Sequence, residues 1–159
     1  MEPPSTGNIT VINESNRRVR VTQLGHAAKT ALSRHGKDHA AVCILLTDDE
    51  NIRRLNHEFR GIDEATDVLT FPAAAFPGAP LGDIAISVEY AQRQAALRKV
   101  SLSQELGYLA IHGALHLIGF DDETDEDRLA MVGEMNDSAV AAGLKPDTNW
   151  YSILHGEEK

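Results

Sequence analysis

Strand-like patterns dominate the first half of the chain, and helical patterns dominate the second half. Four short segments rich in apolar or β-branched residues predict strands at residues 9–12, 40–46, 68–71 and 83–88. Apolar residues at helical spacing, together with capping patterns, predict helices over residues 21–32, 47–59, 89–99, 101–118 and 124–142. This order of elements is typical of an α+β fold, in which helices pack on a small mixed β-sheet.

Three capping patterns indicate where helices begin. Thr47, Ser101 and Thr124 each start a four-residue segment that ends in Glu, Gln or Asp. The side-chain oxygen of such a residue can accept from the third backbone N–H of the helix that follows. We therefore expect these three residues to be N-caps, and we expect Gly119 and Gly143 to follow the last two helices.

The length and composition predict one ordinary domain. The chain has 159 residues, of which 42% are hydrophobic and 25% are charged. A domain typically contains roughly 100–200 residues. We expect a single domain over residues 1–159, with a flexible segment at residues 1–7, a surface loop at 73–82 and an irregular segment at 144–159.

The charge balance excludes a protein that holds nucleic acid by bulk electrostatics. Acidic residues outnumber basic residues by 24 to 15, a net charge of −9, whereas phosphate binding needs clustered Lys and Arg. Residues 1–60 nevertheless carry nine basic and seven acidic residues, a net +2, which leaves −11 for residues 61–159. Two arginine clusters lie in that first part, and they permit a local basic groove: Arg17, Arg18 and Arg20, and Arg53, Arg54 and Arg60.

The apolar run at residues 40–46 is too short to cross a membrane. It has seven residues, whereas a spanning helix needs about 20. The single cysteine, Cys43, lies in this run. We therefore expect its side chain to be buried, where it would act as a small hydrophobic group. Residues 1–6 lack the pattern of a signal peptide, so we expect a cytoplasmic protein with no membrane partner.

A histidine pair on the predicted helix 101–118 is the strongest chemical signal. His112 and His116 lie four residues apart, which puts both imidazoles on one helix face, where they can bind one metal ion. Gly119 ends the helix, so the chain can turn back and offer a third ligand from Asp121 or Asp122.

Gly113, beside the first histidine, distinguishes this helix from a His-Glu-x-x-His peptidase helix. It stands where such a helix has its general-base glutamate. A glycine inside a helix costs about 1 kcal/mol relative to alanine. Its presence therefore indicates either close backbone approach or a plain packing requirement.

Residues 112–122, His-Gly-Ala-Leu-His-Leu-Ile-Gly-Phe-Asp-Asp, resemble the signature of the YbeY family, His-Gly-x-Leu-His-Leu-x-Gly-Tyr-Asp-His. Three more segments are similar to family motifs in the same order. They are Leu-Asn-His-Glu-Phe-Arg at 55–60, Ala-Thr-Asp-Val-Leu-Thr-Phe-Pro at 65–72 and Leu-Gly-Asp-Ile at 81–84. The resemblance implies a fold similar to that of zinc peptidases. It also implies a single-strand-specific, metal-dependent endoribonuclease, which acts in 16S ribosomal RNA 3′-end maturation and in ribosome quality control. The implied partners are ribosomal RNA and the small ribosomal subunit with its maturation factors.

The chain departs from the family at one metal ligand. The family's three zinc ligands map onto His112, His116 and position 122, where this chain has Asp122. Sites with two His and one carboxylate also hold catalytic zinc, so Asp122 can be the third ligand. Alternatively, Asp121, Asp125 or a water takes its place. A carboxylate ligand makes harder metals more competitive, and the same ligand set occurs in non-haem iron(II) sites. We expect Zn²⁺ or another divalent metal.

Arg60 maps onto an arginine that the resemblance implies is essential for activity. Its planar guanidinium suits a phosphate, and it suits the extra charge of the transition state better. We therefore expect His112, His116 and Arg60 to be the catalytic residues.

Two other functions stay open from the sequence alone. One is a metal-dependent hydrolase of another class, such as a peptidase. The other is a non-catalytic ribosome-maturation factor whose metal is structural. Four other interpretations concern structure: Thr66 and Asp67 support the site, Met131 and Met135 lie in the core, Trp150 and Tyr151 pack onto the domain, and His57 is exposed.

Overall fold

The computed structural model describes residues 8–74, 76, 79–147 and 150. The expected flexible segment at residues 1–7 and Tyr151 lie outside these residues. The strands are β1 (Ile9–Asn13), β2 (Val42–Thr47), β3 (Val68–Pro72) and β4 (Gly82–Ser87). The helices are α1 (Val21–Ser33), α2 (Asp49–Arg60), α3 (Val88–Arg98), α4 (Leu102–Leu117) and α5 (Asp125–Ala141). The predicted α+β fold and the order of its elements are confirmed.

The four strands form one mixed sheet in the order β1-β2-β4-β3. β2 pairs in parallel with both β1 and β4, and β3 pairs with β4 in antiparallel register, Pro72 opposite Gly82. β1 and β3 are therefore the edge strands. Gly82, expected in the loop 73–82, is instead the first residue of β4.

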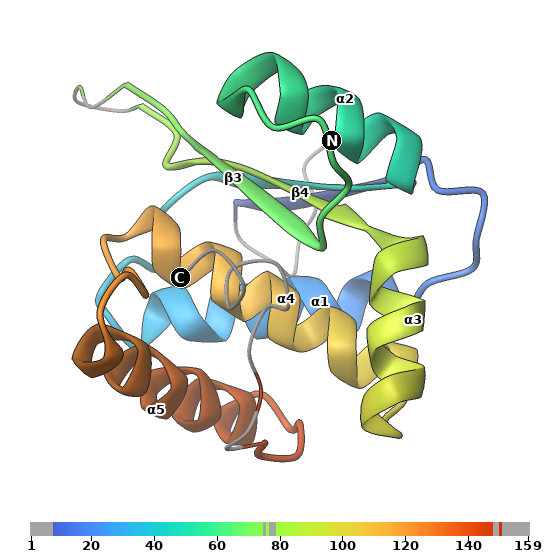
Figure 1. Cartoon of the computed structure of the whole chain (residues 1–159). Coiled ribbons are helices and arrows are strands. Elements are labelled where there is room, and N and C mark those ends of the chain that lie inside the picture. The colour runs from blue at the N-terminus through green and yellow to red at the C-terminus, as the bar shows by residue number, and fades with distance from the viewer. Residues whose placement is uncertain (1–7, 75, 77–78, 148–149, 151–159) are drawn as a thin grey trace.

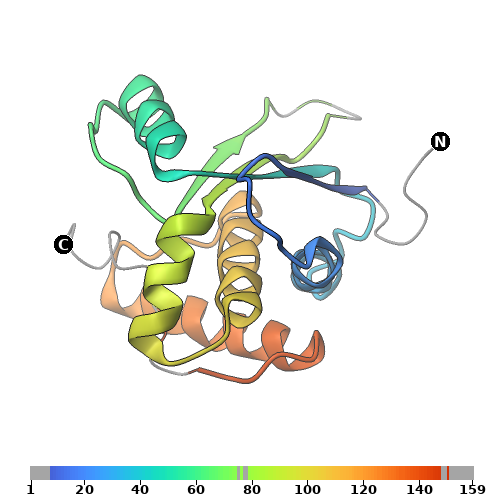
Figure 2. The same ribbon diagram turned by 90° about the vertical axis from the view of Figure 1, so that its right-hand side faces the viewer.

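Helices cover both faces of the sheet to different extents (Figures 1 and 2). α2 lies on one face, over a small core of Ile52, Leu69 and Ala85. α1 and α4 lie on the other face, and α3 and α5 pack against α4. The main core is on this second side and contains the expected Met131 and Met135.

α4 is the central helix and is buried on nearly all sides. The sequence predicts one apolar face, but almost every residue from Glu105 to Leu117 is buried. Two glycines of this helix let its neighbours approach closely. A Cβ on Gly107 would lie 2.6 Å from Leu144, and one on Gly113 would lie 2.9 Å from Ile84. A helix that is buried all round is one that other elements enclose.

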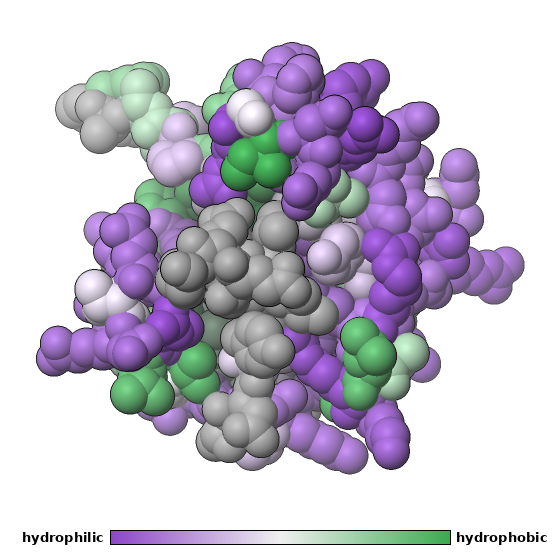
Figure 3. All heavy atoms as spheres, in the orientation of Figure 1, coloured by the Kyte–Doolittle hydropathy of each residue, from purple (hydrophilic) through white to green (hydrophobic). Residues whose placement is uncertain are grey.

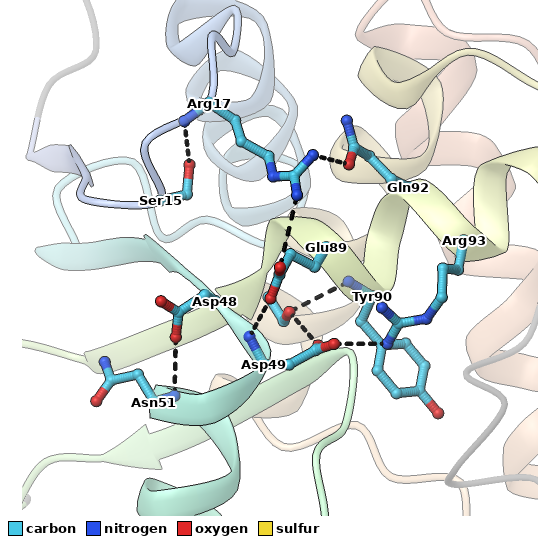
Figure 4. Close-up of polar contacts among 10 residues, drawn as sticks. Ser15, Arg17, Asp48, Asp49, Asn51, Glu89, Tyr90, Gln92 and Arg93 are labelled. Atoms are coloured by element: carbon cyan, nitrogen blue, oxygen red, sulfur yellow. Dashed lines mark hydrogen bonds and ion pairs between the residues drawn. The ribbon is translucent and has the colours of Figure 1, made fainter.

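Polar contacts at the carboxyl ends of β2 and β4 fix the starts of α2 and α3 (Figure 4). The N-cap of α2 is Asp48, which accepts from Asn51 N at 2.9 Å, so the prediction of Thr47 was wrong by one residue. Ser87 caps α3 and donates to Asp49 at 2.7 Å. Glu89 accepts from the backbone N–H of Asp49 at 2.9 Å, and these contacts join the two helix starts.

The predicted N-caps of α4 and α5 are confirmed. Ser101 accepts from Gln104 N at 3.0 Å, and Thr124 accepts from Asp127 N at 3.0 Å. Acidic residues fill the first turn of α5, where negative charge is favourable near the positive end of the helix dipole. The dense acidic run after the histidine pair is therefore part of a helix start.

Cys43 corrects another expectation. It is only half-buried, because it points to the α2 face of the sheet. There it borders a hollow of about 490 Å³ that is mostly apolar. Burial, with the nearby Asp83 carboxylate, raises the pKa of its thiol.

In the part of the chain that the structure describes, no helix is long and apolar enough to cross a membrane.

Candidate metal centre

The position of α4 against β4 places the histidine pair. Gly113 lies so close to the sheet that a Cβ there would be 2.9 Å from Cγ2 of Ile84. All three nearest atoms belong to the Ile84 side chain of β4, so packing against a side chain explains this glycine, rather than a close backbone approach. His112, the preceding residue, is only 3% exposed.

Three side chains converge at the carboxyl end of α4. The Nε2 atoms of His112 and His116 are 3.0 Å apart. Oδ2 of Asp122 lies 4.0 Å from the first nitrogen and 3.9 Å from the second. One ligand atom from each residue lies within 4.8 Å of the others, and one of the three residues is buried while two are half-buried. The structure thus brings together the three residues named from the sequence.

The turn after α4 orients the second histidine. Nδ1 of His116 lies 3.0 Å from the backbone oxygen of Phe120. A carbonyl oxygen only accepts, so Nδ1 carries the proton and a neutral imidazole has its lone pair on Nε2. Gly119, at φ +110°, provides the turn that brings Phe120 back. Metal-binding histidines commonly donate their other ring N–H to a backbone carbonyl in this way. No sequence motif predicts this contact.

Two of the alternatives to Asp122 have other roles. Oδ1 of Asp121 accepts from the backbone N–H of Glu123 at 3.2 Å. Asp125 pairs with Arg128, and the same arginine donates to the backbone oxygen of Asp122 at 3.2 Å. Within the described residues, the group suited to a metal contains Asp122 and neither of the other two aspartates.

The donor atoms suit a small divalent cation. Zinc binds imidazole nitrogen and carboxylate oxygen at about 2.0–2.2 Å, so two tetrahedral ligand atoms lie roughly 3.3 Å apart. The three observed separations of 3.0, 3.9 and 4.0 Å bracket that value. Three protein ligands leave a coordination position for water or substrate, as in catalytic zinc sites.

A buried acidic network lies behind the site. Glu105 is 1% exposed, and both its oxygens accept from Arg98 at 2.8 Å. Burial raises the pKa of Glu105 to about 7, against the opposing effect of Arg98. Asp67 is also buried, and it accepts from Val68 N at 2.7 Å and from Gln94 at 3.2 Å. These bonds favour the structural interpretation of Asp67.

Arg60 belongs to a different element from the three converging side chains. It is the exposed last residue of α2. This helix lies on the face of the sheet opposite α4 (Figures 1 and 2). Its neighbour Phe59 contacts Phe71 of β3, with ring centroids 5.3 Å apart. The end of α2 therefore sits over one face of edge strand β3, and α4 packs on the other.

The second arginine cluster lies on α2, and one arginine of the first cluster lies near this helix. Arg17 lies near the start of this helix, where it donates to Gln92 at 2.5 Å and pairs with Glu89 (Figure 4). Arg53 pairs with Asp63 at 2.7 Å, halfway along. The helix is about 18 Å long at 1.5 Å per residue. Figure 3 shows mainly hydrophilic side chains over α2 and α3 on this face of the molecule.

The comparison with known families matches most of this chain. The family model described as Endoribonuclease YbeY matches residues 9–141. The chain belongs to the YbeY family. The predicted resemblance is thus confirmed.

Curated members of the YbeY family are similar over parts of their length. Endoribonuclease YbeY of Nautilia profundicola is 51% identical over 82 residues, which are 52% of this chain and 59% of that protein. The protein of the same name from Nitrobacter hamburgensis is 48% identical over 104 residues, 60% of this chain and 53% of that protein. The one from Anaeromyxobacter sp. is 40% identical over 129 residues, 80% of this chain and 67% of that protein. The matched part of this chain thus spans between about half and two thirds of the length of these three relatives.

A solved structure shares the fold. The solution structure of TM1509 from Thermotoga maritima is 27% identical, with a TM-score of 0.60. The match covers 82% of this chain and 85% of that one. The arrangement of helices about the mixed sheet is therefore one that a solved protein also adopts.

Proposed function

We propose that this chain is a metal-dependent endoribonuclease that cleaves single-stranded RNA in the cytoplasm and matures the 3′ end of 16S ribosomal RNA. We further propose a role in ribosome quality control, with the small ribosomal subunit and its maturation factors as partners. The observation that carries the proposal is the group His112, His116 and Asp122, within 4.8 Å of one another in a chain of the YbeY family.

The three side chains would hold one ion, Zn²⁺ or another divalent metal. Bound there, the metal would supply a Lewis acid for a phosphodiester oxygen and a more acidic water. The lone pair of His116 Nε2 would be available to the ion because Nδ1 donates its N–H to the backbone oxygen of Phe120. The Asp122 carboxylate lowers the net positive charge of the site by one unit relative to three histidines, which favours harder metals.

Arg60 would bind the scissile phosphate of an RNA that passes around edge strand β3. Two features of Arg60 fit the proposal. Its side chain is exposed at the end of α2. Among the described residues no carboxylate pairs with it, whereas Arg53 pairs with Asp63. A guanidinium can make two parallel hydrogen bonds to a phosphate. Because the net charge is −9, we expect weak binding of free RNA and dependence on the ribosome to present the target.

The metal ligands are tested by metal analysis. Asp122→Ala, purified without added metal, is expected to contain far less metal than the parent. Asp121→Ala is the matched control, because it removes a neighbouring carboxylate that bonds to a backbone N–H. Unchanged metal content in the Asp122 variant would exclude Asp122 as a ligand.

The role of Arg60 is tested by cleavage of a precursor ribosomal RNA. Arg60→Glu is expected to abolish cleavage and leave metal content and folding unchanged. Arg54→Glu makes the same charge change on the same helix and is expected to retain most activity. Cleavage by the Arg60 variant at the parent's rate would refute the role. Casein digestion by the parent, without RNA cleavage, would indicate a peptidase instead.

A further inference from the structure

Trp150 lies against the first metal-ligand candidate. It follows α5 and returns to α4, where it is only 3% exposed. Its ring centroid is 5.2 Å from that of His112 and 5.8 Å from that of Tyr108. Both partners are on α4. Glu105, Tyr108 and His112 follow one another at three and four residues, so they lie on one face of this helix.

The side chains of Glu105 and Arg98 hold the indole in place. Its Nε1 donates toward both oxygens of Glu105 at 3.2 Å. The guanidinium of Arg98 lies 5.1 Å from the Trp150 ring centroid, within the range of a cation–π contact. Glu105 is 1% exposed, and its ion pair with Arg98 measures 2.8 Å. α3 and α4 therefore fix both the polar edge and one face of the ring.

The two histidines are thus supported by different means. His116 is oriented by the backbone oxygen of Phe120. The ring of His112 packs against a large aromatic side chain, at an interplanar angle of 53°. An imidazole that is confined before it binds loses less freedom on binding.

We propose that Trp150 is a positioning residue for His112, which restricts its imidazole to the orientation that binds the metal. The inference rests on the metal site of the proposed function. Substitution of a residue that supports a metal ligand typically lowers metal affinity about 10–100-fold. Loss of the Trp150 ring should therefore weaken metal binding without removing any ligand.

The chain offers a direct probe, because Trp150 is its only tryptophan. Co²⁺ titration of the parent is expected to quench the intrinsic fluorescence, since the ion would sit beside the indole. Zn²⁺ affinity is then measured by competition with a chromophoric chelator for the parent, Trp150→Leu and Trp150→Phe. We expect about a tenfold loss for leucine and a smaller loss for phenylalanine, which keeps an aromatic ring but lacks the N–H.

Leu144→Ala is the matched control. Leu144 precedes Trp150 in the same segment, is 7% exposed and packs on Gly107 of α4. This variant loosens the same segment without touching His112, so its stability should fall while its Zn²⁺ affinity stays within about twofold of the parent. Circular dichroism confirms that each variant is folded at the temperature of the titration.

The outcomes separate this inference from the proposed function. Weaker zinc binding by the leucine variant, with an unchanged control, supports the positioning role even if the parent cleaves no RNA. Equal affinities for parent and leucine variant, or unquenched parent fluorescence while Co²⁺ is bound, overturn it. If the parent binds no metal in the chelator assay, both the metal site and the positioning role are refuted.

Discussion

Gly113 and Gly133 form a matched pair that measures how tightly α4 packs on the sheet. Both lie inside helices, α4 and α5 respectively. A Cβ on Gly113 would meet Cγ2, Cδ1 and Cγ1 of Ile84 at 2.9, 3.0 and 3.2 Å. A Cβ on Gly133 would meet nothing within 4 Å. The same substitution to alanine therefore differs mainly in the contact with Ile84.

The expected free energies of unfolding follow from two opposing effects. Alanine gains about 1 kcal/mol over glycine in a helix interior. An extra methyl group in a packed core costs about 1–3 kcal/mol. Gly133→Ala should therefore stabilise the protein by about 1 kcal/mol. Gly113→Ala should change its stability by between zero and a loss of about 2 kcal/mol.

Urea unfolding, monitored by far-ultraviolet circular dichroism, measures both variants. A second background tests the cause: Ile84→Ala removes all three contacting atoms, so Gly113→Ala should become stabilising there by about 1 kcal/mol. The coupling free energy between the two positions would be about 1–3 kcal/mol. Equal effects of the two glycine substitutions in the parent, or a penalty that persists in the Ile84→Ala background, would refute this account of the packing.

Two further predictions concern groups with shifted pKa values. Native Glu105 keeps its proton up to a pKa of about 7, whereas the unfolded carboxyl loses it near 4.5, so stability should fall by up to roughly 3 kcal/mol as pH rises between these values. Urea unfolding at pH 4.5 and pH 8 should show a much smaller fall for Glu105→Gln, and an equal fall would contradict the shift. The Cys43 thiol, whose pKa burial and Asp83 raise, should react with a thiol reagent at pH 8 more slowly than in the urea-unfolded chain. Asp83→Asn should speed that reaction in the native protein, and an unchanged rate would exclude the carboxylate as a cause.

The sequence predicts those parts of the site that depend on local spacing. His112 and His116 share a helix face because four residues make about one turn, and Asp122 follows within six residues of the second histidine. The four strands could be predicted for a similar reason, since each is a short apolar run between turn residues. α4 was harder to predict in detail, because its burial on all sides depends on three other helices and the sheet.

Contacts between distant segments could not be predicted in this way. Trp150 and His112 are far apart in sequence, and their 5.2 Å contact depends on how the segment after α5 returns to α4. Arg60 could be identified from its sequence motif, but its position relative to the histidines could not. Only the fold shows that α2 and α4 lie on opposite faces of the sheet.

This placement sharpens how an acidic protein could act on RNA. The arginines along α2 and the two histidines on α4 are separated by the edge strand β3. A short rigid duplex would fit poorly around such an edge, whereas a single strand can bend around it. Few cationic groups would touch the RNA at once, so affinity would depend weakly on salt compared with a basic RNA-binding protein. The proposed preference for single strands and the proposed need for a presenting partner would then have one cause, the small number of contacts that this edge offers.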